Sequence, residues 1–381
     1  MLLLTSAYPL LKRLDENGGD VCKELVGQCL ASWQANGFRI RSIHNRAEEA
    51  RLGTLFPGVE YRFVDEELGP EARKTPSFSA VLADLDPDEP VGIINADVFM
   101  AGAPDFAERI GKIAREATVI MHRWEVPSLR RREGQRFDMG VDLLAFTPRR
   151  IAPALEAFAR HPYQLGVPWW DYALPVAASL YAPLVLVSDP ILLHHTHEQA
   201  WNSGEWHKFA RISSDFLETQ SRSPAADPKV ARELQRRLAR IERDHRGTSR
   251  PKEVDYALAE LTLRWMHVYS ERRNLSLLSE MTLPASGRTL DDPAEDDLLA
   301  AMLEADEAYS SAAPEEAAAI RRKMPRREFK TPLTLALYRE ISTESSAWQV
   351  LRAGLRDIGL VARSVGKLLE RRVRRRRRGY S

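Results

Sequence analysis

An apolar run in the middle of the sequence ends in an amide and a carboxylate. The segment PVGIINADVFMAG (90–102) leads a strand-like stretch into Asn95 and Asp97, followed by small residues. In open α/β sheets, ligands bind beyond the carboxyl ends of the strands, so a carboxylate at this point faces a crevice. Asp97 could hold Mg2+ or Mn2+, which favour oxygen ligands and bridge protein carboxylates to phosphates. The alternative is that Asn95 and Asp97 only end the strand and cap the next segment.

Two further aspartates stand at the start of another predicted strand. The segment FDMGVDLLAFTPRRIAPAL (137–155) places Asp138 before a glycine and Asp142 within an apolar run. A carboxylate in an apolar run is either paired in the interior or part of a cleft. Asp138 and Asp142 are therefore either site residues or one loop aspartate and one aspartate at a strand edge.

A third carboxylate follows two tryptophans in LGVPWWDYALPVAA (165–178). Asp171 stands at a predicted helix start, where it could act as a general base or bind an acceptor hydroxyl. Trp169 and Trp170 could stack against a sugar. A structural role fits the same residues, because an aspartate in the first turn of a helix is favoured by the helix dipole and the tryptophans could belong to the core.

Histidines cluster after a predicted strand in SDPILLHHTHEQAWN (188–202). His194, His195 and His197 are three of the nine histidines in the chain. Such a cluster more often marks a metal or phosphate site than a single histidine does. A pure zinc site is not favoured, because the two cysteines, Cys22 and Cys29, lie in an early predicted helix. There we expect buried thiols too far apart for a disulfide.

Strand-like and helix-like segments alternate over the first 190 residues, and they must position these side chains. The strand candidates, several rich in Val and Ile, are 2–5, 39–44, 59–64, 91–99, 118–122, 141–147 and 184–188. The helix candidates between them are 20–36, 47–55, 77–84, 104–116, 149–160 and 170–180. This alternation predicts an α/β fold with a mainly parallel sheet.

After about residue 205 the strand patterns stop. Helices are predicted at 228–246, 253–271, 291–301 and 313–323. We therefore expect a helical appendage rather than a continuation of the sheet. The expected organisation is an α/β domain at 1–205, a helical region at 206–345, and a basic amphipathic helix with an Arg-rich tail at 346–381.

The formal net charge of +1 conceals a strong asymmetry. Residues 347–381 hold eleven Lys and Arg against two acidic residues, whereas the rest of the chain holds 44 basic against 52 acidic residues. Apolar residues recur every three or four positions from Trp348 onward, opposite a basic face. The pattern suits a helix packed on the body with a solvated tail, or attachment to an anionic membrane surface. Nucleic-acid binding is not favoured, because no aromatic residues interleave with the arginines.

Composition excludes several classes of protein. With 381 residues, 44% hydrophobic and 29% charged, the chain is not mainly disordered, collagen-like or disulfide-stapled. No window reaches the roughly 18 consecutive apolar residues that a membrane span needs. The apolar run at 2–4 is too short for a signal peptide. We expect a cytoplasmic protein, which its basic terminus could hold at the inner face of the membrane.

Taken in order, these segments resemble a nucleotide-sugar transferase domain of the GT-A type over about residues 1–205. Thr5–Pro9 followed by Cys29–Trp33 resembles the first strand and helix of such domains, and Ile93–Asp97 resembles the acidic D-x-D motif. The pattern is also similar to a group of glycosyltransferase-like proteins with INSDI, DxFxF, GxxxWD and HxxH segments. Their counterparts here are Ile94–Val98, Asp142–Phe146, Gly166–Asp171 and His194–His197.

The resemblance implies a glycosyltransferase that moves a sugar from a nucleotide-diphosphate donor to a glycan or lipid-linked acceptor, assisted by Mn2+ or Mg2+. It implies Asp171 and Asp142 as catalytic residues. The implied metal ligands are Asp97, His194 and His197. The implied donor-binding residues are Asn95, Asp97, Asp138 and Trp170.

Two other functions remain open at this point. Asn95 stands where the D-x-D motif has its first acid, which favours a non-catalytic relative that binds a nucleotide or glycan or acts as a scaffold. The third hypothesis is a helical interaction protein that acts through its basic tail. Absence of metal-dependent donor binding would favour the second hypothesis. Loss of all function on deletion of 347–381 would favour the third.

Overall fold

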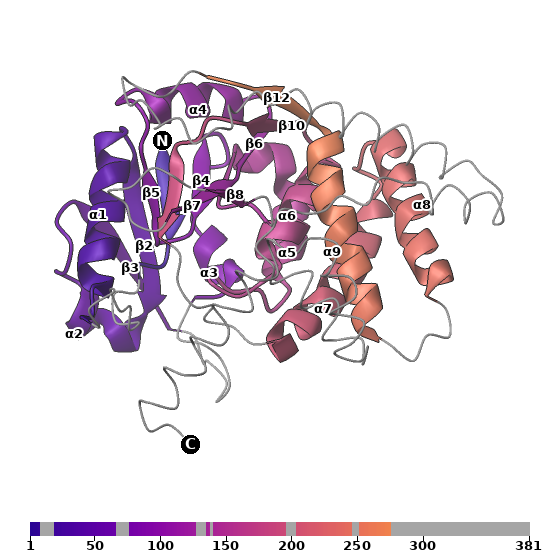
Figure 1. Cartoon of the computed structure of the whole chain (residues 1–381), viewed down its shortest axis with the longest axis horizontal. Coiled ribbons are helices and arrows are strands. Elements are labelled where there is room, and N and C mark those ends of the chain that lie inside the picture. The colour runs from indigo at the N-terminus through magenta and orange to yellow at the C-terminus, as the bar shows by residue number, and fades with distance from the viewer. Residues whose placement is uncertain are drawn as a thin grey trace, which may run out of the picture. The chain divides into compact units, whose positions relative to one another are not determined.

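Figure 1 shows the computed structural model of the chain. It describes residues 1–7, 19–65, 76–126, 135–137, 140–195, 203–245 and 251–275. Residues Met1–Leu290 form one compact unit, and a second unit, Asp291–Ser381, lies wholly outside the described residues.

A large sheet forms the centre of the first unit. Its strands lie in the order β12 (Ser270–Arg273), β10 (Leu184–Val187), β6 (Thr118–Met121), β9 (Leu143–Phe146), β4 (Val91–Ile94), β1 (Leu2–Thr5), β2 (Arg39–Asn45) and β3 (Val59–Val64). Every neighbouring pair is parallel except those of β9, which runs antiparallel to both β4 and β6. The predicted α/β class with a mainly parallel sheet is confirmed.

A second, smaller sheet lies beside the carboxyl ends of β4 and β6. Its order is β5 (Val98–Met100), β11 (Leu192–His195), β7 (Arg123–Val126) and β8 (Gln135–Phe137). Both β5 and β7 follow directly from strands of the main sheet, after three residues and one residue respectively. The two sheets are therefore joined by very short connections.

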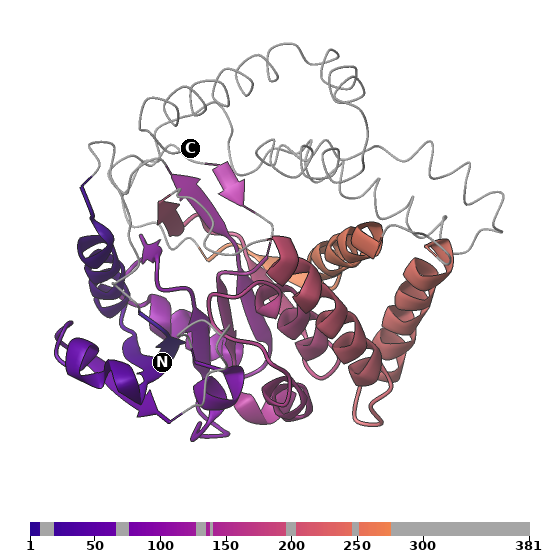
Figure 2. The same cartoon turned by 90° about the horizontal axis from the view of Figure 1, so that it is seen from below.

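Helices accompany the strands. They are α1 (Cys22–Ala35), α2 (Glu49–Leu52), α3 (Phe78–Leu82), α4 (Phe106–Ala114), α5 (Ala152–Ala159), α6 (Trp170–Ala178), α7 (Ser203–Ser221), α8 (Pro228–Asp244) and α9 (Pro251–Val268). Short 3-10 turns at Arg46–Glu48 and Pro148–Ile151 precede α2 and α5. Figures 1 and 2 place α1 with β2 and β3 on one side of this unit, and α7, α8 and α9 on the other.

Helix α1 shows why these segments fold as they do. Its buried residues include Cys22, Leu25, Cys29 and Trp33, three or four positions apart, so one face of the helix is apolar. Gly37, at a φ of 83°, ends the turn that follows the helix, a conformation that side chains with a Cβ rarely adopt. Both cysteines are buried and free, as predicted.

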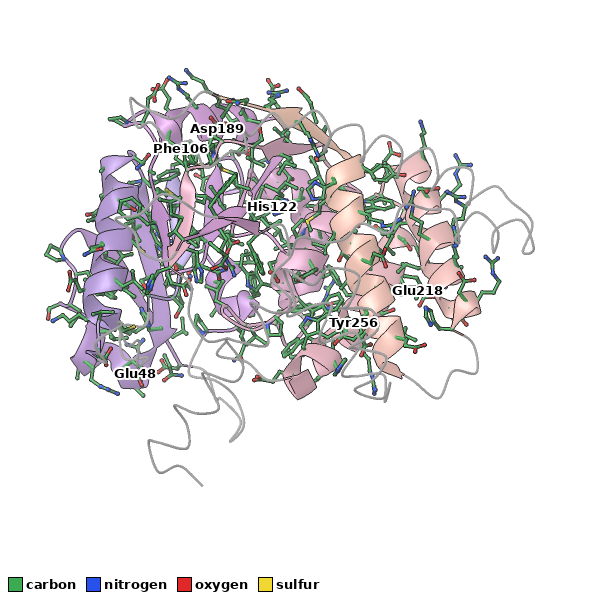
Figure 3. The ribbon with its side chains drawn as sticks, in the orientation of Figure 1. Glu48, Phe106, His122, Asp189, Glu218 and Tyr256 are labelled. Atoms are coloured by element: carbon green, nitrogen blue, oxygen red, sulfur yellow. The ribbon has the colours of Figure 1, made fainter. Side chains whose placement is uncertain are left out.

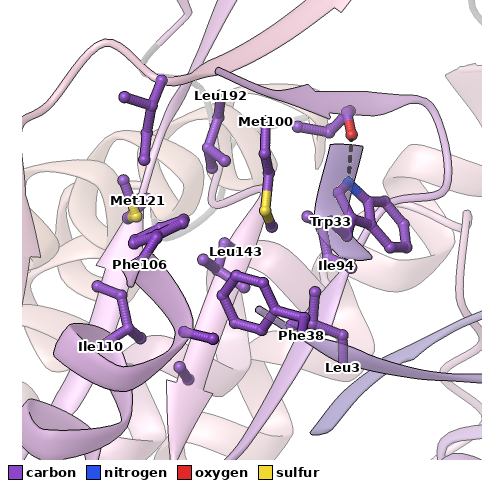
Figure 4. Packing of buried hydrophobic residues seen from close by; sticks show 14 of the residues in the cluster. Leu3, Trp33, Phe38, Ile94, Met100, Phe106, Ile110, Met121, Leu143 and Leu192 are labelled. Carbon is purple, nitrogen blue, oxygen red and sulfur yellow. Dashed lines mark hydrogen bonds between the residues drawn. The ribbon is translucent and has the colours of Figure 1, made fainter. Parts of the chain in front are cut away.

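A large apolar cluster, here called the main cluster, lies between this helix, α4 and the main sheet (Figure 4). Phe38 and Phe106 meet edge to face with ring centroids 5.4 Å apart. The indole Nε1 of Trp33 donates a 2.7 Å hydrogen bond to the carbonyl of Val98, at the first residue of β5. The core therefore also holds the connection between β4 and β5 in place.

The structure corrects the predicted strands in three places. The single strand expected at 91–99 is two strands, because the turn at 95–97 takes the chain from the main sheet into the small one. Strands β7, β8 and β11 were not predicted, since they are only three or four residues long and mix polar with apolar residues. The expectation that no strand follows residue 205 is wrong: β12 joins the main sheet beside β10 through backbone pairing.

The first part of the expected helical region is helical. Helices α7 and α9 pack against α6, and α8 packs against α7 and α9. The boundaries of the helical region that the sequence predicts, near residues 205 and 345, stay predictions. The helices expected at 291–301 and 313–323 and the basic segment 346–381 lie outside the described residues. Within the described residues, no helix combines the length and apolar character needed to cross a membrane.

We expect Phe106→Ala to lower the free energy of unfolding by about 3–5 kcal/mol, because Phe106 is fully buried in the main cluster and its removal leaves a cavity. Urea denaturation followed by circular dichroism measures the loss. Lys112→Ala on the same helix is the control; its side chain is 72% exposed, and the cost should stay within about 0.5 kcal/mol. Equal losses of unfolding free energy in the two variants would contradict the burial of Phe106 in the core.

Candidate functional site

The candidate site begins where the main sheet ends. Strands β4 and β6 finish at Ile94 and Met121, and the antiparallel β9 begins at the same edge. The backbone N–H of Asn95 donates to the carbonyl of Asp142 at 3.4 Å, and its side-chain Nδ2 donates to Asp142 Oδ1 at 3.1 Å. The structure therefore brings together two of the predicted residues at the carboxyl ends of parallel strands.

One face of the small sheet supplies three charged or titratable side chains. In the strand register, Arg123 lies opposite Phe137, and Glu125 lies opposite His194. Directly paired residues project on the same face of a sheet, and residues two apart on one strand also share a face. Arg123, Glu125 and His194 are therefore neighbours. The Arg123 guanidinium lies 4.1 Å from the centroid of the Phe137 ring, a cation–π contact.

These side chains join the two sheets in one closed network of contacts. Arg123 donates from Nη1 to Asp142 Oδ1 and from Nε to Glu125 Oε1, both at 2.8 Å. The other oxygen of Glu125 lies 3.0 Å from His194 Nδ1. Nε2 of the same histidine lies 3.4 Å from Asp97 Oδ2. Because Asp97 and Asn95 share one turn, the network starts and ends on the β4–β5 connection.

Exposure differs along this network. The side chain of Asp142 is 2% exposed and that of His194 6%, whereas that of Asp97 is 24% exposed. Arg123 and Glu125 lie between, at 19% and 15%. Asp97 is thus the carboxylate of the network most open to a ligand from solution.

Charge pairing sets the protonation of these groups. Burial alone would raise the pKa of Glu125, but the hydrogen bond and charge of His194, together with Arg123, lower it to about 2. Burial and Arg123 act to lower the pKa of His194, yet its contacts with Asp97 and Glu125 outweigh them and raise it. Glu125 is therefore ionised at neutral pH and holds the His194 ring by its Nδ1 edge.

Asp171 lies next to this network, in the first turn of α6. Its Oδ1 accepts a 3.1 Å hydrogen bond from the backbone N–H of Trp169, whose φ of 86° is rare for a bulky residue. Its other oxygen lies against Gly140, where a Cβ would overlap the carboxylate. Burial, reinforced by the charge of Asp142, raises the pKa of Asp171 to about 8. Asp171 therefore holds its proton at neutral pH.

Gly140 also connects this carboxylate to the small sheet. Its φ is 94°, a conformation that favours glycine. Its carbonyl oxygen lies 2.7 Å from Nδ1 of His122, which immediately precedes Arg123 in the sequence and is labelled in Figure 3. The Asp171 carboxylate can therefore lie this close to the backbone only because residue 140 is a glycine.

The structure gathers most but not all of the predicted site residues. Asn95, Asp97, Asp142 and His194 share one network, and Asp171 lies beside it. Trp170 is elsewhere: it is 2% exposed and its ring packs against Phe78, so its predicted role in donor binding stays a prediction. Asp138 and His197 lie outside the described residues.

Sequence reasoning missed Arg123 and Glu125, the two residues that connect the network. The signal was present in HRWEV (122–126), where charged and apolar residues alternate directly after an apolar strand. The predicted strand 118–122 ends at His122, so the alternation that follows it was not interpreted as a second strand.

The expected metal ligands form a pair in the described structure. Asp97 and His194 are in contact, and no group of three or more His, Cys, Asp or Glu among the described residues is arranged to hold a metal ion. A cation held there would need ligands from a substrate, from water or from residues beyond the described ranges.

We expect Asp171→Asn to remove a pH dependence of stability. Folded Asp171 has a pKa of about 8 against an ordinary value of 3.8, so unfolding releases a proton between these pH values. Raising the pH from 4 to 8 therefore lowers the wild-type free energy of unfolding relative to that of the variant. Urea denaturation at several pH values measures the difference.

The control for this experiment is Asp88→Asn, whose carboxylate is 64% exposed and pairs with Arg149 on the surface. That variant should keep the wild-type dependence on pH. A wild-type curve parallel to that of Asp171→Asn would show that Asp171 is ionised in the folded protein.

No protein-family model and no curated protein matches this sequence. Solved structures that match this chain include a mannosyltransferase from Pyrobaculum calidifontis in complex with GDP-Man and Mn2+, at 14% identity and a TM-score of 0.36, covering 97% of this chain and 87% of that one. Rv0371C from Mycobacterium tuberculosis, in complex with manganese, matches at 13% identity and 0.32, covering 54% and 95%. A mannose-1-phosphate geranyltransferase from Thermus thermophilus matches at 16% and 0.24, covering 55% and 78%.

Proposed function

We propose that this chain is a transferase that takes a sugar from a nucleotide-diphosphate donor, with the help of a divalent cation, and passes it to a glycan or lipid-linked acceptor. The observation that carries the proposal is the contact between Asp97 and His194 at the carboxyl end of β4. That is the edge where ligands bind in open α/β sheets. The order of the sequence motifs along the chain supports the same function.

The donor set fits a divalent cation that shares its ligands with a substrate. Mg2+ is commonly bound by one or two protein carboxylates together with substrate phosphates, so a complete cage of protein ligands is not required. Histidine ligands are usually oriented by a carboxylate on the other ring nitrogen. Glu125 occupies that position at His194 Nδ1, and the opposite edge, Nε2, faces Asp97. Asp97 and His194 would hold the cation.

A cation at this point would neutralise charge that develops on the departing nucleoside diphosphate. The protein's own side chains would position the site and bind the acceptor. Asn95 and Arg123 hold Asp142 in place beside the turn that carries Asp97. Asp171 would bind the acceptor hydroxyl. With a pKa of about 8 it is mainly protonated at neutral pH, so it would accept the proton only in its ionised form, which predominates above that pH.

The acceptor side of the proposal is supported by sequence alone. The basic amphipathic segment 346–381 would bring the protein to the cytoplasmic face of an anionic membrane, where lipid-linked acceptors lie. The five consecutive arginines 374–378 would supply much of that attraction.

The proposal predicts metal-dependent donor binding. A panel of UDP-, GDP-, dTDP- and CMP-sugars is tested by thermal shift, each with and without Mn2+. One nucleotide class should raise the unfolding midpoint only with Mn2+, by the equivalent of about 2.7 kcal/mol at 100 times its Kd. Asp97→Ala should abolish the shift, because it removes the most exposed carboxylate of the network.

The matched control is Asp88→Ala, a surface aspartate paired with Arg149, which should keep the full shift. A folded wild type that responds to no donor would overturn the proposal and favour a relative of this fold without catalytic activity. A shift retained in Asp97→Ala would leave donor binding intact but remove Asp97 from it.

A further inference from the structure

We propose that Arg123 binds the diphosphate of the nucleotide donor through its Nη2 group, an inference that rests on the proposed function. Neither the sequence motifs nor the predicted site residues include this arginine. The geometry of its guanidinium and its place in the network assign the role.

The guanidinium is held rigidly on two edges and one face. Its Nε donates to Glu125 and its Nη1 to Asp142, both at 2.8 Å, and the Phe137 ring lies 4.1 Å from its centre. A guanidinium has five N–H donors in a fixed plane. Within the described part of the chain, Nη2 makes no hydrogen bond. The two carboxylates therefore orient the guanidinium and leave a pair of donors for another acceptor.

The Arg123 side chain is only partly buried. The Arg123 side chain is 19% exposed, whereas Asp142, one of its two partners, is 2% exposed. An arginine buried only to neutralise Asp142 would need no exposed part. A guanidinium stays charged in a partly buried site and holds its remaining N–H groups in a fixed plane, which suits Nη2 to single hydrogen bonds with phosphate oxygens.

Arg123 is also placed beside the proposed cation pair. Glu125 contacts Arg123 through Oε1 and His194 through Oε2, and His194 in turn contacts Asp97. One carboxylate thus separates the guanidinium from the two residues that would hold the cation. A diphosphate has two phosphate groups in a row, so one could meet the cation while the other meets Arg123.

The charge of the network predicts that this binding depends on a cation. Three carboxylates, Asp97, Glu125 and Asp142, surround one guanidinium and one imidazole. The site alone therefore does not favour an anion. A divalent cation at Asp97 would reverse that balance.

The test uses inorganic pyrophosphate and orthophosphate as probes, titrated into the full chain by calorimetry with and without Mg2+. Wild type should bind pyrophosphate with Mg2+, and more tightly than orthophosphate. We expect Arg123→Lys to weaken pyrophosphate binding about 10-fold and Arg123→Met about 100-fold, as loss of hydrogen bonds to a charged group implies. Orthophosphate, which needs only the cation, should lose much less.

Arg41→Met is the matched control. Arg41 also lies in a strand, pairs with one carboxylate, Glu60, at 2.7 Å, and is 21% exposed. It should bind pyrophosphate as the wild type does. Folded Arg123 variants with wild-type affinity would overturn the inference, and so would a wild type that binds no pyrophosphate.

Arg123→Met leaves two carboxylates without their cation and could unfold the protein. The double variant Arg123→Met with Asp142→Asn removes one of those charges. A second measurement needs no variant: phenylglyoxal modification of the wild-type chain, read peptide by peptide by mass spectrometry. Pyrophosphate with Mg2+ should protect Arg123 and leave Arg41 reactive. Equal modification of Arg123 with and without pyrophosphate would overturn the inference.

These outcomes separate the inference from the proposed function. A chain that binds pyrophosphate through Arg123 but no nucleotide sugar would lose the transferase proposal and keep the diphosphate site. A chain with metal-dependent donor binding that Arg123 variants leave unchanged would keep the transferase proposal and lose this residue's role.

Discussion

The Arg123 guanidinium links side chains from the two sheets of this protein. Arg123 comes from the small sheet, and its partners are Asp142 at the start of β9 in the main sheet and Glu125 on its own strand. Taking these charges out of water is expensive, and removing one partner of such a group typically costs about 3–5 kcal/mol. These three side chains therefore stabilise the junction of the two sheets beside the site.

The apolar core also holds the site residues in place. Trp33 of α1 reaches through the main cluster to the Val98 carbonyl, one residue beyond Asp97. The turn that carries Asn95 and Asp97 is thus fixed by an indole on one side and by Asp142 on the other. Groups that act on a ligand need such support, because a small displacement of a catalytic group has a large effect on rate.

Much of the α/β framework could be predicted from the sequence, and the connection between its parts could not. Several predicted strands of the main sheet are apolar runs such as Val91–Ile94 and Leu184–Val187, which burial on both faces requires. Asn95 and Asp97 were recognised because they follow such a run. Arg123 and Glu125 were missed because β7 is only four residues long and half-polar, so its partners on β8 and β11 define it more than its own pattern does. Asp171 was found by its motif, but its neutral state depends on burial and on the charge of Asp142, which lies far away in the sequence, and no local pattern reveals either.

Strand β12 shows how a segment with no apolar pattern can protect a sheet. Its neighbour β10, Leu184–Val187, is fully buried and would make a flat, apolar border if it were outermost. β12 covers it with Ser270, Glu271, Arg272 and Arg273, whose last three side chains are exposed. Another copy of the chain that tried to add a strand at this border would have to desolvate those charges. The border of the described sheet is thus built against edge-to-edge aggregation, which keeps the many apolar strands behind it from joining those of other molecules.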